Sequence, residues 1–350
     1  MLAVALLRIG VDARAVSPHG KGLARVQQGV LEALSARSDA PEIRAFVTSP
    51  EAAALVSVDA EVVRVRPSIL WELGGLPLRV RGLDALVTWT DRLAPFGLPP
   101  TVVWLYESPV HRIRLNRQLR TGGYQRGADL LTLALWKPTL RRAAHVVFGS
   151  HATSDEVLAE LPELRGRTSV VHAALAPGFA PGPARERGTY VFHISSHDPR
   201  DNTKTAIEAA RLAGVRLLVA GGARFGAAGA DVEFLGRVSD AELIDLYRGA
   251  AAYLDPTLFE GFGYGVLEAM SCGAPVVASN ATSIPEIVGD AGLLCDPLSA
   301  EDVAAALRRV LDEPGLAEEL RRRGLARAAE FSWERTAAGL LAAVRAAVQA

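Results

Sequence analysis

Short apolar runs alternate with longer amphipathic stretches along most of the chain. The runs are a few residues long and apolar throughout, which is typical of strands buried on both faces. The stretches between them carry apolar residues at helical spacing. We expect strands at 4–9, 43–48, 85–88, 102–105, 145–149, 190–194, 216–220, 252–254 and 275–278, and helices that include 23–37, 153–161, 202–213, 240–249, 300–311 and 332–350. Strand and helix in alternation predict doubly wound parallel sheets of the α/β class.

A Pro- and Gly-rich stretch, 176–183, divides the chain nearly in half. Such composition interrupts regular structure, and a length of 350 residues favours two domains. We therefore expect an N-terminal domain over 1–178 and a C-terminal domain over 179–336. A last helix, 337–350, is expected to pack back on the first domain.

Composition excludes several classes of protein. Hydrophobic residues make up 49% of the chain and charged residues 22%, as in ordinary globular proteins. The two cysteines, Cys272 and Cys295, exclude a disulfide scaffold and fit a reducing cytoplasm. No apolar run reaches the roughly 18 residues of a membrane span, and we expect the apolar start to be a strand, not a leader. A formal net charge of -1 gives no sign of a nucleic-acid partner.

The small net charge hides an uneven distribution. Residues 1–175 carry 21 basic and 16 acidic residues, or +5, and the remaining residues carry 17 and 23, or -6. Residues 111–142 alone hold eight basic residues against Asp129, together with an apolar run that ends at Trp136. Basic residues beside an interfacial Trp favour anionic lipid headgroups. We expect peripheral membrane contact through 111–142; a buried helix beside a cleft for a soluble acidic ligand is the alternative.

The densest chemistry lies between residues 255 and 280. Here an expected strand is followed by a loop, a helix and another strand. Loops at the carboxyl ends of strands bind ligands in open α/β sheets, and bare amides at a helix N-terminus suit an anion. Glu260 lies on the loop and Glu268 about one turn into the helix, so both carboxylates can face one cleft. The loop and the start of the helix also contain three glycines, Gly261, Gly263 and Gly265.

Residues 256–279 resemble the Glu-seven residues-Glu motif of family 4 retaining glycosyltransferases with the GT-B fold (glycosyl transferases group 1). Agreement continues through 234–243, 283–291, 296–297 and 331–333. The resemblance implies two Rossmann-like domains that face a cleft. It implies that Glu268 binds the ribose of a nucleotide sugar and that Glu260 contacts the transferred sugar. The expected donor-binding residues are Gly20, Gly22, Arg200, Lys204, Glu260, Gly261, Phe262, Gly263 and Glu268; for Phe262, packing beneath the loop is the alternative.

The segment 193–204 is expected to stabilise the leaving group. A departing nucleoside diphosphate gains negative charge and needs fixed cations, for which Arg200 is the natural candidate. The family commonly has Lys where this chain has Asp201. Lys204 is expected to supply the missing charge from the first turn of a helix, or else to be a solvated helix residue. We assign catalytic roles to Glu260, Arg200 and Lys204.

The N-terminal half carries a weaker match. Val11-Asp12-Ala-Arg, followed by Gly20-Lys21-Gly22 before a helix, resembles the first glycine loop of the family, with Ala24 in place of a usual glycine. A glycine-rich turn before an ordinary helix is the alternative. The family often has a His-Asp pair after the strand 102–105, where this chain has other residues. The expected acceptor-side residues are Tyr106, Glu107 and His111.

These features predict a metal-independent retaining glycosyltransferase. It would move a hexose from a UDP- or GDP-sugar to a carbohydrate or lipid-linked acceptor, in cell-envelope polysaccharide or glycolipid synthesis. We expect a cytoplasmic protein, peripheral on the inner face of the membrane, with no cofactor. The chain has no Asp-x-Asp pair, dinucleotide fingerprint or glycine-lysine phosphate loop. A nucleotide-sugar epimerase on the same fold and a degenerate donor-binding homologue are the alternatives.

Overall fold

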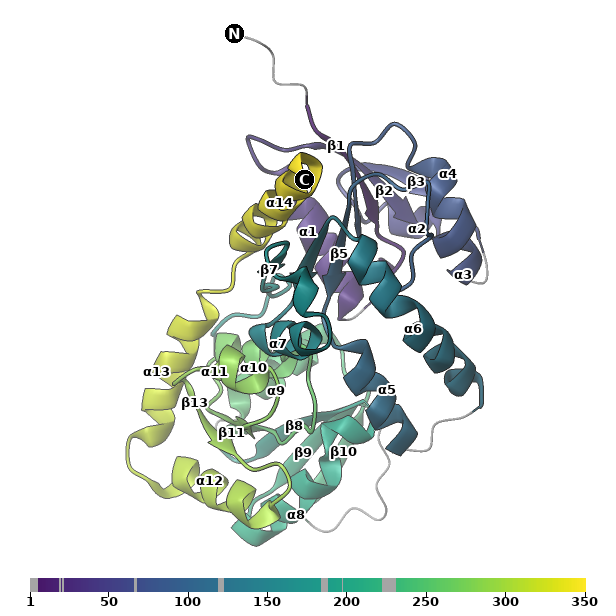
Figure 1. Cartoon of the computed structure of the whole chain (residues 1–350). Coiled ribbons are helices and arrows are strands. Elements are labelled where there is room, and N and C mark those ends of the chain that lie inside the picture. Colours follow the sequence, from purple (N-terminus) through teal and green to yellow (C-terminus); the bar gives the residue numbers. More distant parts are fainter. Residues whose placement is uncertain are drawn as a thin grey trace. The chain divides into compact units, whose positions relative to one another are not determined.

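A computed structural model describes residues 6–18, 20, 22–65, 68–118, 123–183, 188–196, 198–221 and 231–350, with the backbone alone for 68, 112, 115–118 and 123–128. The chain forms two compact units. Unit 1 combines 1–174 with 332–350, and unit 2 is 175–331. The boundaries therefore follow residues 174 and 331, where the sequence placed them after 178 and 336. The C-terminal helix belongs to unit 1 (Figure 1).

Unit 1 is built on a seven-stranded parallel sheet with the order β3-β2-β1-β4-β5-β6-β7. Its strands are β1 (Arg8–Asp12), β2 (Glu42–Val47), β3 (Asp59–Val62), β4 (Ala85–Thr88), β5 (Thr101–Leu105), β6 (His145–Phe148) and β7 (Thr168–Val170). Its helices are α1 (Leu23–Ser35), α2 (Pro50–Ala53), α3 (Ser68–Leu70), the π-helix η1 (Trp71–Gly75), α4 (Leu76–Arg79), α5 (Pro109–Gln118), α6 (Gly123–Arg142), α7 (His151–Glu160), the 3₁₀ turn η2 (Pro162–Leu164) and α14 (Trp333–Gln349).

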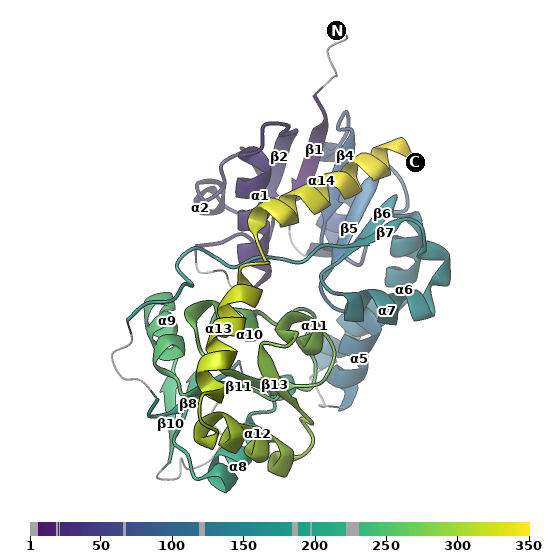
Figure 2. The same cartoon turned by 90° about the vertical axis from the view of Figure 1, so that its left-hand side faces the viewer.

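Helices cover both faces of this sheet because its interior strands are apolar throughout. One face packs against Trp71, Trp136 and Leu140, which come from η1 and α6. On the other face, α14 lies against α1 and crosses β4 to β7 (Figure 2). The Thr336 hydroxyl of α14 donates to the His172 carbonyl after β7 (2.7 Å), which fixes the helix on unit 1.

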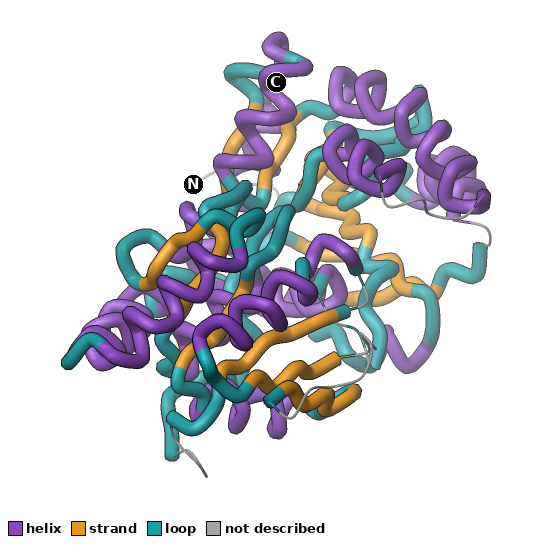
Figure 3. Tube along the Cα trace, turned by 90° about the horizontal axis from the view of Figure 1, so that it is seen from below, coloured by secondary structure: helices purple, strands orange, loops and turns teal. Residues whose placement is uncertain are grey.

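Unit 2 is built on a six-stranded parallel sheet with the order β10-β9-β8-β11-β12-β13. Its strands are β8 (Val191–Ser195), β9 (Leu217–Gly221), β10 (Val232–Gly236), β11 (Ala252–Asp255), β12 (Val276–Ser279) and β13 (Gly292–Cys295). Its helices are the 3₁₀ turn η3 (Pro199–Asp201), α8 (Thr203–Ala213), α9 (Asp240–Gly249), α10 (Tyr264–Cys272), α11 (Ile284–Val288), α12 (Ala300–Asp312) and α13 (Leu316–Ala328). Figure 3 shows strands in orange between helices in purple.

The expected α/β class is confirmed, and all nine expected strands are present. The first begins at Arg8 instead of residue 4, and residues 1–5 lie outside the described part of the chain. Four strands were not expected, namely β3, β7, β10 and β13, and these are the four edge strands of the two sheets. An edge strand has one partner and more contact with solvent, so its sequence can lack the continuous apolar run of an interior strand, as in β3 (Asp-Ala-Glu-Val) and β7 (Thr-Ser-Val).

The helix α6 corrects one expectation. Trp136 is 1% exposed and packs in the core of unit 1, so its assignment to a lipid interface is wrong. Lys137 and Arg141 of the same helix form ion pairs with Glu160 and Glu163 at 3.0 and 2.8 Å. The side chains of Arg112, Arg117, Arg120 and Arg126 lie outside the described residues.

Candidate functional site

The order of strands in unit 2 points to one ligand-binding edge. The strands β8 and β11 are neighbours, and the chain leaves them in opposite directions, toward β9 and β12. Ligands bind open α/β sheets at such a switch point, outside the carboxyl ends of the strands. The loops after β8 and β11 contain Arg200 and Glu260, so two of the three expected catalytic residues lie at this edge, and the third, Lys204, is in the helix α8 that follows.

Backbone contacts join the loops at the switch point. Asn202, which has a left-handed backbone (φ 54°), donates through Nδ2 to the carbonyls of Pro256 (2.9 Å) and Pro297 (2.7 Å). The Leu258 amide donates to the Arg200 carbonyl at 2.8 Å. Asn tolerates the left-handed region because its short amide forms local hydrogen bonds. Asn202 therefore holds the β8 loop on the β11 loop.

Glu260 is fixed through both sides of its backbone. Its amide donates to the Thr282 hydroxyl (3.0 Å), and its carbonyl accepts from the Ser283 hydroxyl (2.9 Å). Both partners lie between β12 and α11. The side chain of Glu260 is partly exposed. A third loop thus positions this carboxylate at the carboxyl edge of the sheet.

Glu268 lies in the wall of α10. It is 8% exposed, and its Oε2 accepts a hydrogen bond from the Tyr247 hydroxyl at 3.0 Å. Burial, followed by the charge of Glu268, raises the pKa of Tyr247 well above its usual range, so this phenol remains a donor. The ribose contact implied for Glu268 stays a prediction.

The buried phenol of Tyr253 donates a hydrogen bond to Asp255 Oδ2 at 3.3 Å. Burial raises the pKa of this phenol well above its usual range, and the charges that raise it further belong to Asp255, Glu268, Glu260 and Asp201. The interior of the site is therefore acidic, and its oxygen atoms can accept hydrogen bonds from sugar hydroxyls. A bound anion must find its stabilising charges at the rim of the site.

Gly263 and Gly265 are each required by the local structure, for different reasons. Gly263 precedes α10 with φ 109°, a backbone that favours glycine. A Cβ at Gly265 would lie 2.3 Å from the Tyr253 hydroxyl, so this helix can approach β11 only with glycine there. Phe262 is 3% exposed and packs against Phe331, with ring centroids 6.1 Å apart. The side chain of Phe262 thus packs beneath the loop, as the alternative interpretation expected.

The expected cations have different environments. Arg200 is paired with Asp198 through Nη2 (2.6 Å) and Nε (2.8 Å). Lys204 is exposed in the first turn of α8 and has no polar partner among the described residues. Asp201 accepts from the amide (2.5 Å) and hydroxyl (2.9 Å) of Ser196, and burial raises the pKa of its carboxyl. Of these two expected cations, Arg200 is thus paired with a carboxylate, whereas Lys204 has no acidic partner among the described residues.

Sequence reasoning missed two buried ionisable groups at the switch point. His193 lies between the Leu254 carbonyl (2.9 Å from Nδ1) and the Thr203 hydroxyl (3.0 Å from Nε2), and burial lowers its pKa to about 4. Burial and the nearby charge of Asp201 raise the pKa of Asp255 to about 7. Their signal in the sequence was a polar residue inside or at the end of an apolar run.

The expected glycine loop of unit 1 is partly described. The Gly20 amide donates to the Ser17 carbonyl (3.0 Å), and a Cβ at Gly20 would lie 2.3 Å from that of Ala24. Gly22 precedes α1 with φ 53° and open space where a side chain would be. Lys21 lies outside the described residues.

The three expected acceptor-side residues follow β5. Tyr106 stacks on Trp104, with centroids 5.5 Å apart, and its carbonyl accepts from the Thr153 hydroxyl (3.2 Å). The Nδ1 atom of His111 lies 3.0 Å from Glu156 of α7. Glu107 is partly buried next to Tyr106. These contacts give His111 and Tyr106 local partners within unit 1.

The described residues contain neither a cluster of metal ligands nor a membrane-spanning helix. No three His, Cys, Asp or Glu side chains in this part of the chain are grouped so as to hold a metal ion. No helix in the described ranges combines the length and the apolar character needed to cross a membrane.

Comparison with known proteins identifies the class. Residues 188–313, which lie in unit 2, match the family model described as Glycosyl transferases group 1. The chain is similar to sucrose-phosphate synthase from Thermosynechococcus elongatus (TM-score 0.74, 21% identity, 97% of this chain and 98% of that one). It is also similar to Anabaena HepE solved with UDP and glucose (TM-score 0.70, 19% identity, 97% and 99% of the two chains). The chain therefore has the GT-B fold.

A sequence relative covers a shorter segment. O-antigen chain mannosyltransferase B from Escherichia coli is 48% identical over 103 residues, which are 29% of this chain and 27% of the relative. The match thus covers about a quarter of the length of that relative.

Proposed function

We propose that the chain is a retaining glycosyltransferase that moves a hexose from a nucleotide-diphosphate sugar to a hydroxyl of a carbohydrate acceptor. The observation that carries this proposal is the position of Glu260. Three loops meet at the switch point of unit 2, and their hydrogen bonds fix Glu260, with its carboxylate oxygens, at the carboxyl edge of the sheet. Such oxygens suit vicinal hydroxyls, because one carboxylate accepts two hydrogen bonds, each stabilising by about 1.5–3 kcal/mol when charge-assisted.

The diphosphate of the donor would bind at the rim of this acidic interior. The N-termini of α8 and α10 offer backbone amides and the positive end of a helix dipole. Lys204, in the first turn of α8, adds a full charge, and Arg200 adds another when it exchanges Asp198 for phosphate. These groups act most strongly on the leaving group, where negative charge grows during the reaction. No metal or cofactor is part of the proposal.

Retention would follow from attack on the same face that the leaving group departs from. The bond between the anomeric carbon and the phosphate oxygen breaks as the acceptor oxygen bonds to that carbon. The departing phosphate takes the acceptor proton, so no residue of the chain has to act as the base. A double displacement would need a carboxylate nucleophile about 5 Å from an acid/base carboxylate, roles that we assign to no pair of residues here.

We propose mannose as the hexose. Support comes from the Escherichia coli relative, whose name describes a mannosyltransferase of the O-antigen chain and whose matched region is 48% identical. Glucose is the second candidate, because Anabaena HepE was solved with UDP and glucose. Thermal shift with GDP-mannose, UDP-glucose and their free nucleotides would separate the two, and no stabilisation by any nucleotide sugar would contradict the proposal.

We also propose that the acceptor belongs to cell-envelope polysaccharide or glycolipid and that 111–142 contacts the membrane. The uneven charge of this segment supports it. Leu130 of α6 is 61% exposed, while Trp136 contributes nothing at the surface. Sedimentation with anionic liposomes at low and high salt measures this contact, and no pelleting at low salt would contradict it.

The deciding experiment compares three variants. Glu260→Gln and Arg200→Ala are expected to lower turnover by orders of magnitude while the melting temperature changes little, because both side chains are partly exposed. Glu208→Gln is the matched control, since Glu208 is an exposed carboxylate of α8 paired with Arg211 at 3.8 Å. Wild-type turnover in the first two would refute the proposal. Conversion of the donor without acceptor would favour an epimerase, and donor binding without turnover a degenerate homologue.

A further inference from the structure

The connecting segment, residues 176–183, is bound to two helices of unit 2. The Phe179 carbonyl accepts a hydrogen bond from the Ser271 hydroxyl of α10 at 2.6 Å. The next carbonyl, that of Ala180, accepts from Nε (2.9 Å) and Nη2 (2.7 Å) of Arg248 in α9. Both donors lie in the last turn of their helix. The segment therefore ties α9 to α10, the helix that carries the candidate ribose ligand.

The ring of Tyr247, in α9, is enclosed by other aromatic rings. This side chain is 0% exposed. Three rings meet it edge to face, with centroids 5.3 Å away for Phe192, 5.2 Å for Tyr253 and 6.4 Å for Phe179. Aromatic pairs favour this arrangement over a face-to-face sandwich. Because the three rings come from β8, β11 and the connecting segment, the position of the Tyr247 ring is fixed from three directions.

The hydroxyl of this enclosed ring lies at the carboxylate of Glu268. It donates to Oε2 at 3.0 Å, and both side chains are buried. The terminal bond of a glutamate side chain rotates easily, so the plane of its carboxylate is set by hydrogen bonds. A hydrogen bond from a buried phenol to a charged acceptor is strong, because the local dielectric constant is low. Tyr247 thus fixes the orientation of the Glu268 carboxylate.

We propose that Tyr247 is a positioning residue, which holds the carboxylate of Glu268 in the orientation that accepts the ribose hydroxyls of the donor, and that Phe179 holds Tyr247 in place. The inference rests on the proposed glycosyltransferase function and adds two residues that act through Glu268. A carboxylate accepts from both hydroxyls of a vicinal diol when its plane is aligned with them. An acceptor that is already aligned lowers the ordering cost of binding.

The kinetic effect should lie in the KM for donor. The ribose is remote from the anomeric carbon at which bonds break and form, so its contacts are equal in the ground state and the transition state. Loss of such a contact raises KM and leaves kcat nearly unchanged. Tyr247→Phe should therefore raise the KM for donor, whereas Glu260→Gln is expected to lower turnover.

A pair of nucleotides tests the role of the Tyr247 hydroxyl. Calorimetric titration gives the Kd of GDP and of 2′,3′-dideoxy-GDP, or of the two uridine nucleotides where UDP is the one that binds. The wild type should bind the ribonucleotide about tenfold to a hundredfold more tightly, and Tyr247→Phe should lower this ratio by about threefold to tenfold. A merely structural defect would weaken both nucleotides equally and leave the ratio unchanged. Tyr190→Phe is the matched control, because the Tyr190 hydroxyl donates to the Leu246 carbonyl of the same helix at 2.9 Å.

Two further variants separate positioning from packing. In a Glu268→Gln background, Tyr247→Phe should cause no further change in the ratio, because its effect passes through the carboxylate. Phe179→Leu should lower the ratio in the same direction. Phe234→Leu, its control, should not, since Phe234 of β10 packs against the core formed with α8 and α12.

The outcomes distinguish this inference from the function on which it rests. Equal Kd values of the two nucleotides in the wild type would overturn the inference and leave the proposed function intact. A ratio in the Tyr247 variant equal to that of the wild type would do the same. No binding of any nucleotide or nucleotide sugar to the wild type would overturn both.

Discussion

His193 and Asp255 should give unit 2 two opposing pH dependences. Burial lowers the pKa of His193 from 6.5 to about 4, so the unfolded chain binds more protons than the folded one between these values. Its contribution to stability is complete above pH 6.5 and is lost as the pH falls toward 4. Burial raises the pKa of Asp255 from 3.8 to about 7, so the folded chain holds the extra proton. Its contribution is present at low pH and is lost as the pH rises toward 7.

The two effects are of similar size. The lowered pKa of His193 corresponds to about 3 kcal/mol and the raised pKa of Asp255 to about 4 kcal/mol, at about 1.4 kcal/mol for each pH unit. In the wild type they nearly cancel between pH 4 and 6.5. His193→Gln removes the contribution that rises with pH. The free energy of unfolding of this variant, measured relative to the wild type, should therefore fall by about 3 kcal/mol as the pH rises from 4 to 6.5. Asp255→Asn should shift stability in the opposite direction across the same range.

Hydrogen exchange of the amides in β8 and α8 measures the stability of unit 2 directly. Rates at pH 4.5, 5.5 and 6.5, corrected for intrinsic exchange, give the change in free energy of opening for each variant against the wild type. All five Trp residues lie in unit 1, so the urea transition followed by Trp fluorescence is an internal control that neither variant should alter. Variant and wild-type curves that run parallel over this pH range would refute the assigned burial effects.

Three further predictions concern packing around the same site. Gly265→Ala should destabilise unit 2 by about 1–3 kcal/mol and weaken donor binding, because the new Cβ would lie 2.3 Å from the Tyr253 hydroxyl. Gly74→Ala is the control, because a Cβ at Gly74 meets nothing within 4 Å, and it should leave donor binding unchanged. Thermal melts and donor titrations measure both variants, and equal effects of the two substitutions would contradict this account. Asn202→Ala should cost about 2–4 kcal/mol in amide exchange, since it loses two hydrogen bonds and strains a left-handed backbone. Burial raises the pKa of both cysteine thiols to about 12, so iodoacetamide should label neither in the folded chain, as mass spectrometry would show.

Interior strands could be predicted from the sequence, whereas edge strands could not. In β5 every residue is buried, and the run Thr-Val-Val-Trp-Leu is visible as a strand without any tertiary information. The edge strand β3 has the sequence Asp-Ala-Glu-Val and is only partly buried, so its strand character depends on pairing with β2. Such pairing is a tertiary contact, which a local pattern does not contain.

The candidate site was likewise predictable from the sequence only in part. Glu260, Glu268 and their glycines lie within one short segment, so their spacing was visible in the sequence. The hydrogen bond from Tyr247 to Glu268 joins residues 21 positions apart, and no local spacing marks it. Asp198, the acidic partner of Arg200, lies only two positions before it in the sequence, but only the structure shows that the two side chains form an ion pair.

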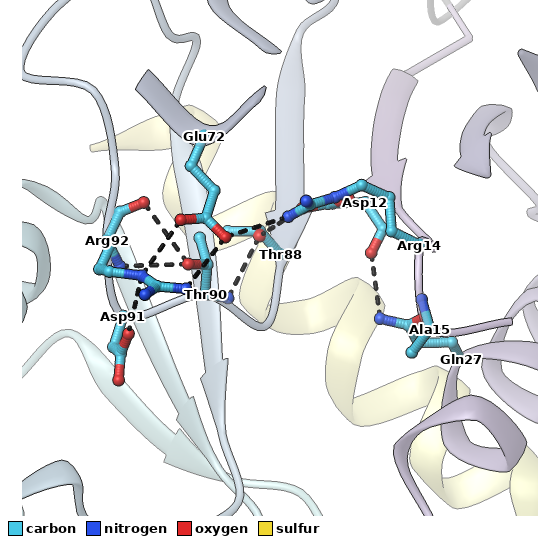
Figure 4. Close-up of polar contacts among 9 residues, drawn as sticks. All are labelled: Asp12, Arg14, Ala15, Gln27, Glu72, Thr88, Thr90, Asp91 and Arg92. Atoms are coloured by element: carbon cyan, nitrogen blue, oxygen red, sulfur yellow. Dashed lines mark hydrogen bonds and ion pairs between the residues drawn. The ribbon is translucent and has the colours of Figure 1, made fainter. Parts of the chain in front are cut away.

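Topology explains why two sites of opposite construction arise on similar sheets. In each unit the chain leaves two neighbouring strands in opposite directions, and a crevice remains that no crossover helix fills. The side chains at the ends of those strands then decide what the crevice binds. In unit 2 carboxylates lie near a buried phenol, Tyr253, and cations lie at the rim, which suits a sugar linked to a diphosphate. In unit 1 the buried carboxylates of Asp12 and Glu72 are paired with Arg14 and Arg92 (Figure 4), so the charges at this edge of the sheet already have partners within the unit.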